Sequence, residues 1–141
     1  SGLPYDSISV ARLYLMFAMK KNEVIISLGS NTHPQENMEK AMNALRKILP
    51  SIVFTDALNT EPIGIESDAF LNCMAKATTE ETLDNLNRQF KEVERNLGDN
   101  GHSTNIVNID IDILAFGDQL LRPSDWERPY IKALYELLTT L

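Results

Sequence analysis

The stretch Asn108-Ile109-Asp110-Ile111-Asp112-Ile113-Leu114-Ala115-Phe116 decides the fold of this chain. Its first residues alternate between polar and apolar, which is typical of a β-strand, so Asp110 and Asp112 project from the same face. The isoleucines on the opposite face predict that this strand covers a hydrophobic core. Two neighbouring carboxylates repel each other, and a bound Mg²⁺ ion would remove that repulsion. The solvated outer face of an antiparallel strand would also explain the pair, and from the pair alone this is the commoner case.

Length and charge limit what the protein can be. With 141 residues, 43% of them hydrophobic, the chain suits one domain with a single core. A formal net charge of -7 argues against a nucleic-acid partner, because binding to a phosphate backbone depends on clustered lysine and arginine. The one cysteine, Cys73, cannot form an internal disulfide and has apolar neighbours. We therefore expect a buried, unreactive thiol and a cytoplasmic location.

The first residues differ in pattern from the rest of the chain. We expect residues 1–18 to be a leader or a remnant of cloning and residues 19–141 to form the functional domain, because Met19 resembles a natural start and a strand pattern begins at Glu23. The apolar run from Val10 to Met19 is too short to cross a bilayer, so we expect no membrane insertion. The sequence leaves the oligomeric state open, although an apolar leader would permit a dimer.

From Glu23 onward, strand-like and helix-like patterns alternate. Their order, β-α-β-β-α-β, predicts an α+β, ferredoxin-like sandwich in which helices cover one face of an antiparallel sheet, with an extra C-terminal helix. The other face of the sheet would then be free to bind a ligand. Thr79 is expected to cap the second helix and Gly98 to end it. Strands are expected at residues 23–28, 52–58, 69–77 and 108–116, and helices at residues 34–48, 80–97 and 131–141.

Three motifs and a weaker closing segment together resemble one enzyme family. They are Ile26-Ser27-Leu28-Gly29-Ser30-Asn31; Thr60-Glu61-Pro62-Ile63-Gly64 followed by Phe70-Leu71-Asn72; Asp110-Ile111-Asp112-Ile113-Leu114; and Arg128-Pro129-Tyr130. In these segments the chain resembles the 6-hydroxymethyl-7,8-dihydropterin pyrophosphokinases of folate biosynthesis. The resemblance extends over residues 24–137, nearly the whole chain after the leader, and the shared order of the motifs makes it specific.

The resemblance implies transfer of pyrophosphate from ATP to the hydroxymethyl oxygen of a reduced pterin, leaving AMP. ATP and the pterin would be the small-molecule partners. Asp110 and Asp112 would hold two Mg²⁺ ions, and Arg128 would be the third catalytic residue. The implied pterin-binding residues are Thr60, Ile63, Phe70, Asn72 and Tyr130, and the implied nucleotide-binding residues are Arg122, Arg128 and His102.

Each implied pterin contact has a structural alternative. Phe70 would stack on the heterocycle, or it would belong to the core of the sheet. Asn72 would hydrogen-bond the pterin edge, because an amide offers both a donor and an acceptor, or it would cap the end of a strand. Tyr130 would cover the second face of the ring, or it would pack at the start of a helix. The backbone at Thr60 and Ile63 would complete the pocket.

The chain departs from the family pattern where phosphate should bind. The family usually carries a long, arginine-rich loop before the aspartate strand, whereas residues 99–107 contain no arginine or lysine. Val107 stands where the family tends to place an arginine, and the usual phosphate-binding histidine is absent near Pro123. Each charge-assisted contact contributes roughly 1.5–3 kcal/mol. The chain is therefore either an active, divergent enzyme, with His102 or Arg122 compensating in part, or an inactive pterin- or nucleotide-binding regulatory paralogue.

Overall fold

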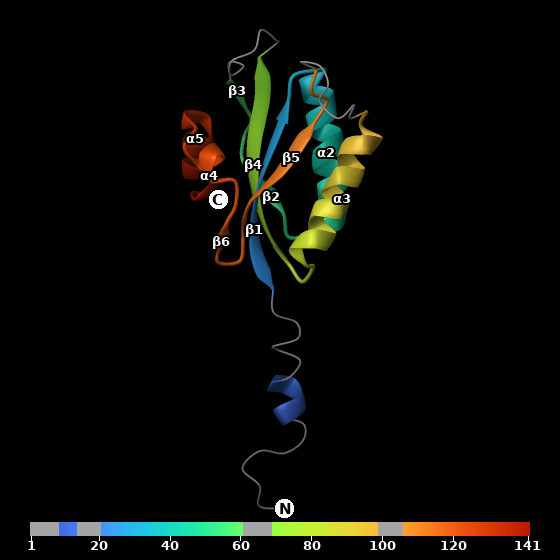
Figure 1. Ribbon diagram of the computed structural model, residues 1–141, viewed down its shortest axis with the longest axis vertical. Helices are drawn as coiled ribbons and strands as arrows, with labels where there is room; N and C mark the ends of the chain where they lie inside the picture. The colour runs from blue at the N-terminus through green and yellow to red at the C-terminus, as the bar shows by residue number, and fades with distance from the viewer. Residues whose placement is uncertain (1–8, 14–20, 61–68, 99–105) are drawn as a thin grey trace, which may run out of the picture.

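The computed structural model describes residues 9–13, 21–60, 69–98 and 106–141. Within these ranges it shows one six-stranded antiparallel sheet with helices on both faces (Figure 1), which confirms the predicted α+β, ferredoxin-like architecture. Residues 9–13 form a short helical segment ahead of this domain. In chain order the domain contains β1 (Asn22–Ser30), α2 (Pro34–Ile48), β2 (Val53–Phe54), β3 (Leu58–Thr60), β4 (Phe70–Thr79), α3 (Leu83–Asn96), β5 (Asp110–Phe116), β6 (Gln119–Leu120), α4 (Pro123–Trp126) and α5 (Pro129–Leu138).

The order of the strands brings three distant segments of the chain together. The sheet runs β2-β4-β1-β5-β6, with β3 also paired to β4. Within it, Gly29 of β1 is paired with Asn72 of β4 on one side and with Asp110 of β5 on the other. Because neighbouring strands lie about 4.8 Å apart, these three residues form a row across one end of the sheet.

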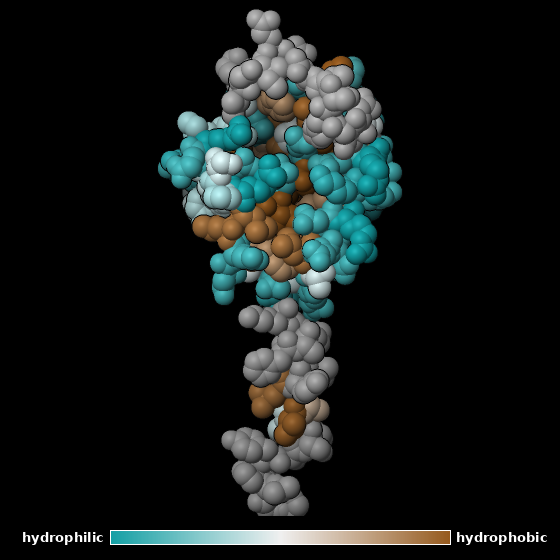
Figure 2. Space-filling model, viewed as in Figure 1, coloured by the Kyte–Doolittle hydropathy of each residue, from teal (hydrophilic) through white to brown (hydrophobic). Residues whose placement is uncertain are grey.

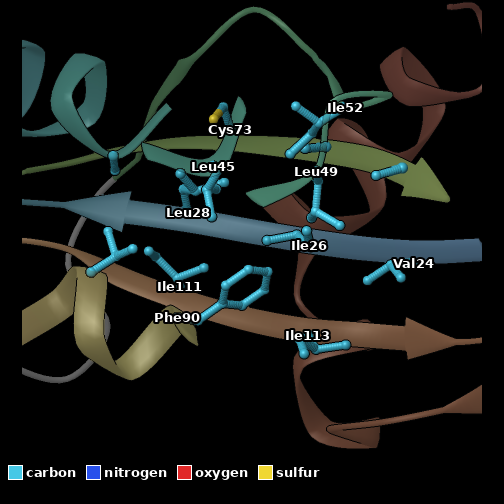
Figure 3. Packing of buried hydrophobic residues seen from close by; sticks show 14 of the residues in the cluster. Val24, Ile26, Leu28, Leu45, Leu49, Ile52, Cys73, Phe90, Ile111 and Ile113 are labelled. Carbon is cyan, nitrogen blue, oxygen red and sulfur yellow. The ribbon is translucent and has the colours of Figure 1, made fainter. Parts of the chain in front are cut away.

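The main hydrophobic core lies between the sheet and the helices α2 and α3 (Figure 3). Alternate residues of β1 and β5 enter it, as the sequence pattern predicted, and burying each large apolar side chain contributes about 1.5–3 kcal/mol. Both helices bury apolar side chains on the face that meets the sheet, and Gly98 follows the end of α3 with a φ of 92°. The buried apolar helix residues are Met38, Ala41 and Leu45 of α2 and Leu86, Phe90 and Val93 of α3.

The opposite face of the sheet is covered in part, although we expected it to be free. Ile131, Leu134 and Leu138 of α5 pack there against Met74 and Leu114 in a second, smaller cluster. The short elements β6 and α4 precede this helix, and neither was predicted. α5 itself begins at its proline, two residues earlier than expected. The C-terminal segment therefore folds back over part of this face of the sheet.

The predicted cap of α3 is wrong by three residues. The cap is Thr82, whose hydroxyl accepts a hydrogen bond from the Asn85 amide at 3.2 Å. Thr79 is the last residue of β4, and its hydroxyl accepts from the Glu81 amide at 3.0 Å. Both threonines satisfy a backbone amide that no carbonyl reaches, which is why the two could be confused from sequence.

The predicted strand over residues 52–58 is in fact two short strands, β2 and β3. Between them, the Thr55 hydroxyl accepts a hydrogen bond from the Met74 amide at 3.0 Å, while the Thr55 amide donates to the Met74 carbonyl at 2.8 Å. The side chain thus replaces one carbonyl of the ladder, and the strand pairing is interrupted. The result is that β3 alone reaches the end of the sheet where Asn72 lies.

Cys73 is buried, as predicted. Its Sγ lies 3.6 Å from Met38 Sδ, and burial raises the pKa of the thiol to about 12. The thiol is therefore protonated and unreactive at neutral pH.

The predicted boundary between leader and domain falls on residues 14–20, outside the described residues, and remains a prediction. In the part of the chain that the structure describes, no helix is long and apolar enough to cross a membrane.

Candidate active site

Every predicted site residue that the structure describes lines one cavity of about 230 Å³. It lies at the end of the sheet where β1, β4 and β5 meet, next to α4 and α5. Ile63 and His102 lie outside the described residues, so their predicted roles remain predictions. The predicted residues in the cavity are Thr60, Phe70, Asn72, Asp110, Asp112, Arg122, Arg128 and Tyr130, and the others are Ser27, Leu28, Gly29, Asp125 and Leu134.

One half of the cavity, which we call the amide end, contains Gly29, Thr60, Phe70 and Asn72. Asn72 is almost fully buried, and its Nδ2 donates a hydrogen bond to Thr60 Oγ1 at 2.5 Å. A Cβ at residue 29 would come within 2.8 Å of Asn72 Oδ1, so only glycine leaves room for this amide. The sequence motif contained this glycine, but its role depends on the register between β1 and β4. The amide end presents a fixed polar group beside an aromatic ring, which suits a flat heterocycle with hydrogen-bonding edges.

The other half, the charged end, contains Asp110, Asp112, Arg122, Asp125 and Arg128. Both aspartates are half-buried on the cavity face of β5, while the isoleucines between and beside them are buried on the core face, as predicted. Arg122 Nη1 lies 3.6 Å from Asp112 Oδ1. The cavity borders the Phe70 and Asn72 side chains as well, so the acidic pair and the amide end face one shared space.

Asp125 joins the two arginines and was missed from sequence. Arg122 Nε lies 2.5 Å from Asp125 Oδ2, and Arg128 Nε lies 3.4 Å from Asp125 Oδ1. The hydrogen bond that Arg122 donates to Asp125 raises the pKa of Arg122, partial burial opposes this shift, and the charge of Asp112 raises the pKa further. A usable signal was present: Pro123 followed by an acidic residue is a typical first helical turn, here that of α4.

The short helix α4 is held in place by Trp126. The indole Nε1 donates to the carbonyls of Leu114 and Leu121, each at 3.0 Å, and the ring contacts Tyr135 edge-on with centroids 5.4 Å apart. Arg122 precedes α4 with a φ of 51°, a left-handed conformation that costs roughly 1–3 kcal/mol for a residue other than glycine. The anchored helix thus maintains a strained backbone that places this arginine at the cavity.

Tyr130, in the first turn of α5, satisfies both alternatives drawn from the sequence. It lines the cavity, and it also packs against the cluster that contains Leu134. Burial raises the pKa of its phenol, while the charge of Arg128 opposes that shift. The ring is therefore neutral at physiological pH and offers an aromatic wall between the two ends of the cavity.

Two asparagines fix the start of β5. The side-chain Oδ1 of Asn31 accepts a hydrogen bond from the backbone N–H of Val107 at 2.7 Å, and the backbone N–H of Asn31 donates to the Val107 carbonyl at 3.0 Å. Asn108 Nδ2 donates to the carbonyls of Leu97 and Gly98, at the end of α3. Val107 therefore contributes backbone hydrogen bonds that orient the strand carrying the two aspartates.

The comparison with known families agrees with this geometry. Residues 25–139 match the family described as 7,8-dihydro-6-hydroxymethylpterin-pyrophosphokinase (HPPK). The chain belongs to this family. A comparison with curated individual proteins gives no match. The activity of the family is pterin pyrophosphorylation in folate biosynthesis, and its members use ATP and Mg²⁺.

The donor set at the charged end fits the Mg²⁺ that HPPK enzymes use. Mg²⁺ is usually bound by one or two carboxylates together with water and substrate phosphates, and Asp110 and Asp112 are such a pair. Among the described residues, no group of three or more His, Cys, Asp or Glu side chains is arranged to hold a metal ion. Phosphate oxygens and water are the usual further ligands of a Mg²⁺ ion bound by such a carboxylate pair.

A second cavity, of about 440 Å³, shares Asp112 and Arg122 with the first. Helix α3 forms one wall, and the β5 residues Ile111 and Ile113 contribute to the other. In Figure 2, hydrophilic surface over α3 and over α4 flanks a recess with an apolar floor. Lys91 of α3 also lines this cavity. The two cavities together provide room for two ligands that meet at the charged end.

Proposed function

We propose that this protein transfers the pyrophosphoryl group of ATP to the hydroxymethyl oxygen of 6-hydroxymethyl-7,8-dihydropterin. The observation that carries the proposal is that the amide end and the charged end share one cavity, in a chain that belongs to the HPPK family. A site that only bound a pterin would not need two carboxylates and two arginines beside the ring.

The pterin lies at the amide end. Its pyrimidine edge hydrogen-bonds to Asn72, whose amide is oriented by Thr60, and its ring stacks between Phe70 and Tyr130. This places the hydroxymethyl group toward Asp110 and Asp112. Because Thr60, Phe70 and Asn72 stand on paired strands, this part of the pocket holds the ring in a fixed position, which lowers the entropic cost of bringing the two reactants together.

The nucleotide lies in the second cavity, with its base against the apolar residues of α3 and β5. Arg122 and Arg128 contact the phosphates, and Asp110 and Asp112 hold Mg²⁺, which when bound neutralises charge on the triphosphate. The hydroxymethyl oxygen attacks the β-phosphorus, the bond from that phosphorus to the oxygen bridging to the α-phosphate breaks so that AMP leaves, and the hydroxyl proton passes to water. The arginines exchange Asp125 for phosphate oxygens as the charge on the transferred group develops.

A second candidate function is pterin binding without phosphoryl transfer. The observation that favours it is the absence of arginine and lysine from residues 99–107. A cytoplasmic location, the number of bound Mg²⁺ ions and the exclusion of nucleic acid remain predictions from the sequence.

Calorimetric titration separates these functions. The ligands are 6-hydroxymethyl-7,8-dihydropterin and α,β-methylene-ATP, each with and without Mg²⁺, because the methylene replaces the bridge that would be cleaved. Binding of the pterin and Mg²⁺-dependent binding of the nucleotide analogue support transfer, and release of AMP from ATP in the presence of the pterin would then establish it. Binding of the pterin alone would support the second function. Binding of neither ligand would contradict both.

A further inference from the structure

Lys91 is the cation on the α3 wall of the second cavity, where Arg122 and Asp112 also lie. Its side chain is 63% exposed, and its Nζ lies 3.2 Å from Glu94 Oε1. From the sequence, we looked for phosphate-binding residues in the segment 99–107 and near Pro123, and so did not consider a lysine on α3. An exposed lysine paired with a glutamate on the same helix is ordinary on any surface, but this glutamate is not on the surface.

Glu94 connects Lys91 to the aspartate strand. Its side chain is 1% exposed, and its second oxygen, Oε2, accepts a hydrogen bond from the Ile111 amide at 2.8 Å. Ile111 stands between Asp110 and Asp112, on a part of β5 that pairs with β1 on one side and, within the described residues, with no strand on the other. One buried carboxylate thus fixes both the backbone between the two aspartates and the ammonium of Lys91.

The electrostatic surroundings keep Lys91 charged. The hydrogen bond and the charge of Glu94 raise the pKa of Lys91, partial burial opposes this, and the charges of Asp112 and Asp110 raise it further. Lys91 also lines the same cavity as Asp112 and Arg122 of the charged end. An ammonium has three N–H donors, and Glu94 accepts from one of them, so two are left for a ligand in the cavity.

We propose that Lys91 binds the phosphate chain of the nucleotide from the side opposite the arginines, and so supplies positive charge that residues 99–107 lack. This inference rests on the proposed function, because it concerns the ATP that the enzyme would use. Lys91 and Arg122 line the cavity from different elements, and Asp112, one of the two residues that would hold Mg²⁺, lines it as well. A triphosphate lying there has a cation on each side, as polyanions in protein sites usually do.

The test is titration of Lys91→Ala with α,β-methylene-ATP and Mg²⁺. We expect the dissociation constant to rise about tenfold, because one charge-assisted contact is lost at a partly exposed site. Lys91→Arg should recover the affinity to within about threefold, since it keeps the charge. The affinity for 6-hydroxymethyl-7,8-dihydropterin should not change.

The matched control is Lys40→Ala. Lys40 is also an exposed helical lysine paired with a glutamate, Glu36, with Nζ 3.0 Å from Oε1, but it lies on α2 away from both cavities. If Lys91→Ala bound the nucleotide analogue as tightly as the unaltered protein, the inference would be overturned and the proposed function would stand. Equal losses for the pterin and the nucleotide would also overturn it, because they would indicate a general structural defect. Failure of the unaltered protein to bind the nucleotide analogue would overturn the proposed function itself.

Discussion

The amide end and the charged end of the cavity are built in different ways. At the amide end, Thr60, Asn72 and Gly29 stand on three strands whose register fixes their relative positions. At the charged end, only the aspartates belong to the sheet, and the arginines stand at the starts of two short C-terminal helices. The amide end is therefore preformed for its ligand, whereas the charged end is held together by ion pairs that a phosphate ligand would replace.

The cost of replacing those ion pairs is small. Arg122 is about half exposed, and ion pairs of such groups contribute roughly 0–1 kcal/mol to stability because water screens them. A charge-assisted contact with phosphate inside a closed site is stronger. In the proposed function, the pterin would therefore meet a surface that is already formed, while the nucleotide would rearrange the side chains that receive it.

The largest effect is expected from Asp110→Asn. The substitution keeps the size of the side chain but removes a carboxylate that the proposed site uses to hold Mg²⁺, so turnover should fall roughly 1000-fold or more. The affinity for the pterin should remain within about threefold, because the amide end is untouched. Steady-state AMP release and pterin calorimetry measure the two quantities. Asp118→Asn, on the exposed turn between β5 and β6, removes the same charge outside the cavity and should leave both unchanged. Equal turnover for the two variants would contradict a metal-binding role.

Gly29→Ala is expected to weaken pterin binding at the amide end. The new Cβ would lie 2.8 Å from Asn72 Oδ1, so the amide must move and its hydrogen bond to Thr60 is lost. We expect pterin affinity to fall roughly 10- to 100-fold, with nucleotide affinity nearly unchanged. The control is Gly117→Ala, which is strained by a φ of 58° and by an approach of 2.9 Å to Asn22 Oδ1, but lies outside the cavity. It should lower the thermal midpoint and leave pterin affinity intact. A preserved pterin affinity in Gly29→Ala would show that Asn72 does not contact the ligand.

The same contrast explains what the sequence could predict. Strand periodicity placed Asp110 and Asp112 on one face, and the motifs around Thr60 and Asn72 indicated the amide end, because these residues act through local pattern and the order of the strands. The reason that Gly29 must be glycine depends on register between β1 and β4, which no local pattern contains. The family resemblance supplied the roles, and the structure places the described residues in one cavity.

The residues that sequence reasoning missed act through packing between elements. Asp125 enters the cavity only because Trp126 ties α4 to the strands beneath it. In the sequence, Glu94 looks like one of many polar residues on an amphipathic helix. Its structural role depends on the hydrogen bond that it accepts from the Ile111 amide of β5. A charged residue on the buried side of α3 was nevertheless a signal, because a buried carboxylate requires a partner.

Asp125→Asn tests whether Asp125 competes with phosphate for the two arginines of the charged end. The substitution keeps an acceptor near Arg122 and Arg128 but removes a negative charge that competes with phosphate. We expect affinity for α,β-methylene-ATP with Mg²⁺ to rise about threefold to tenfold, since opposite charge across a binding site strengthens association. Glu127→Gln is the control, because Glu127 is an exposed acid immediately after α4 that pairs with Lys132 outside the cavity. A weaker affinity in Asp125→Asn would mean that Asp125 orients the arginines and does not compete with the ligand.

The smallest effect is expected for the pH dependence of binding. Measuring it for the nucleotide and for the pterin compares the charged end with the amide end. Glu94 raises the pKa of Lys91 above its usual value of 10.5, and Asp125 likewise raises that of Arg122. Both groups therefore remain protonated between pH 8 and 9.5, where the triphosphate is already fully ionised, and burial of Tyr130 raises its pKa above 10.0 and keeps it neutral. Nucleotide affinity should change less than about twofold over this range, as should pterin affinity at the uncharged amide end.

The Lys91–Glu94 pair also contributes to the free energy of unfolding. This contribution is present below the ordinary lysine pKa and is lost only as pH rises through the raised pKa of Lys91. If the nucleotide affinity fell steeply as pH rises from 8 to 9.5 while the pterin affinity stayed constant, Lys91 would not be held by Glu94 when the ligand is bound.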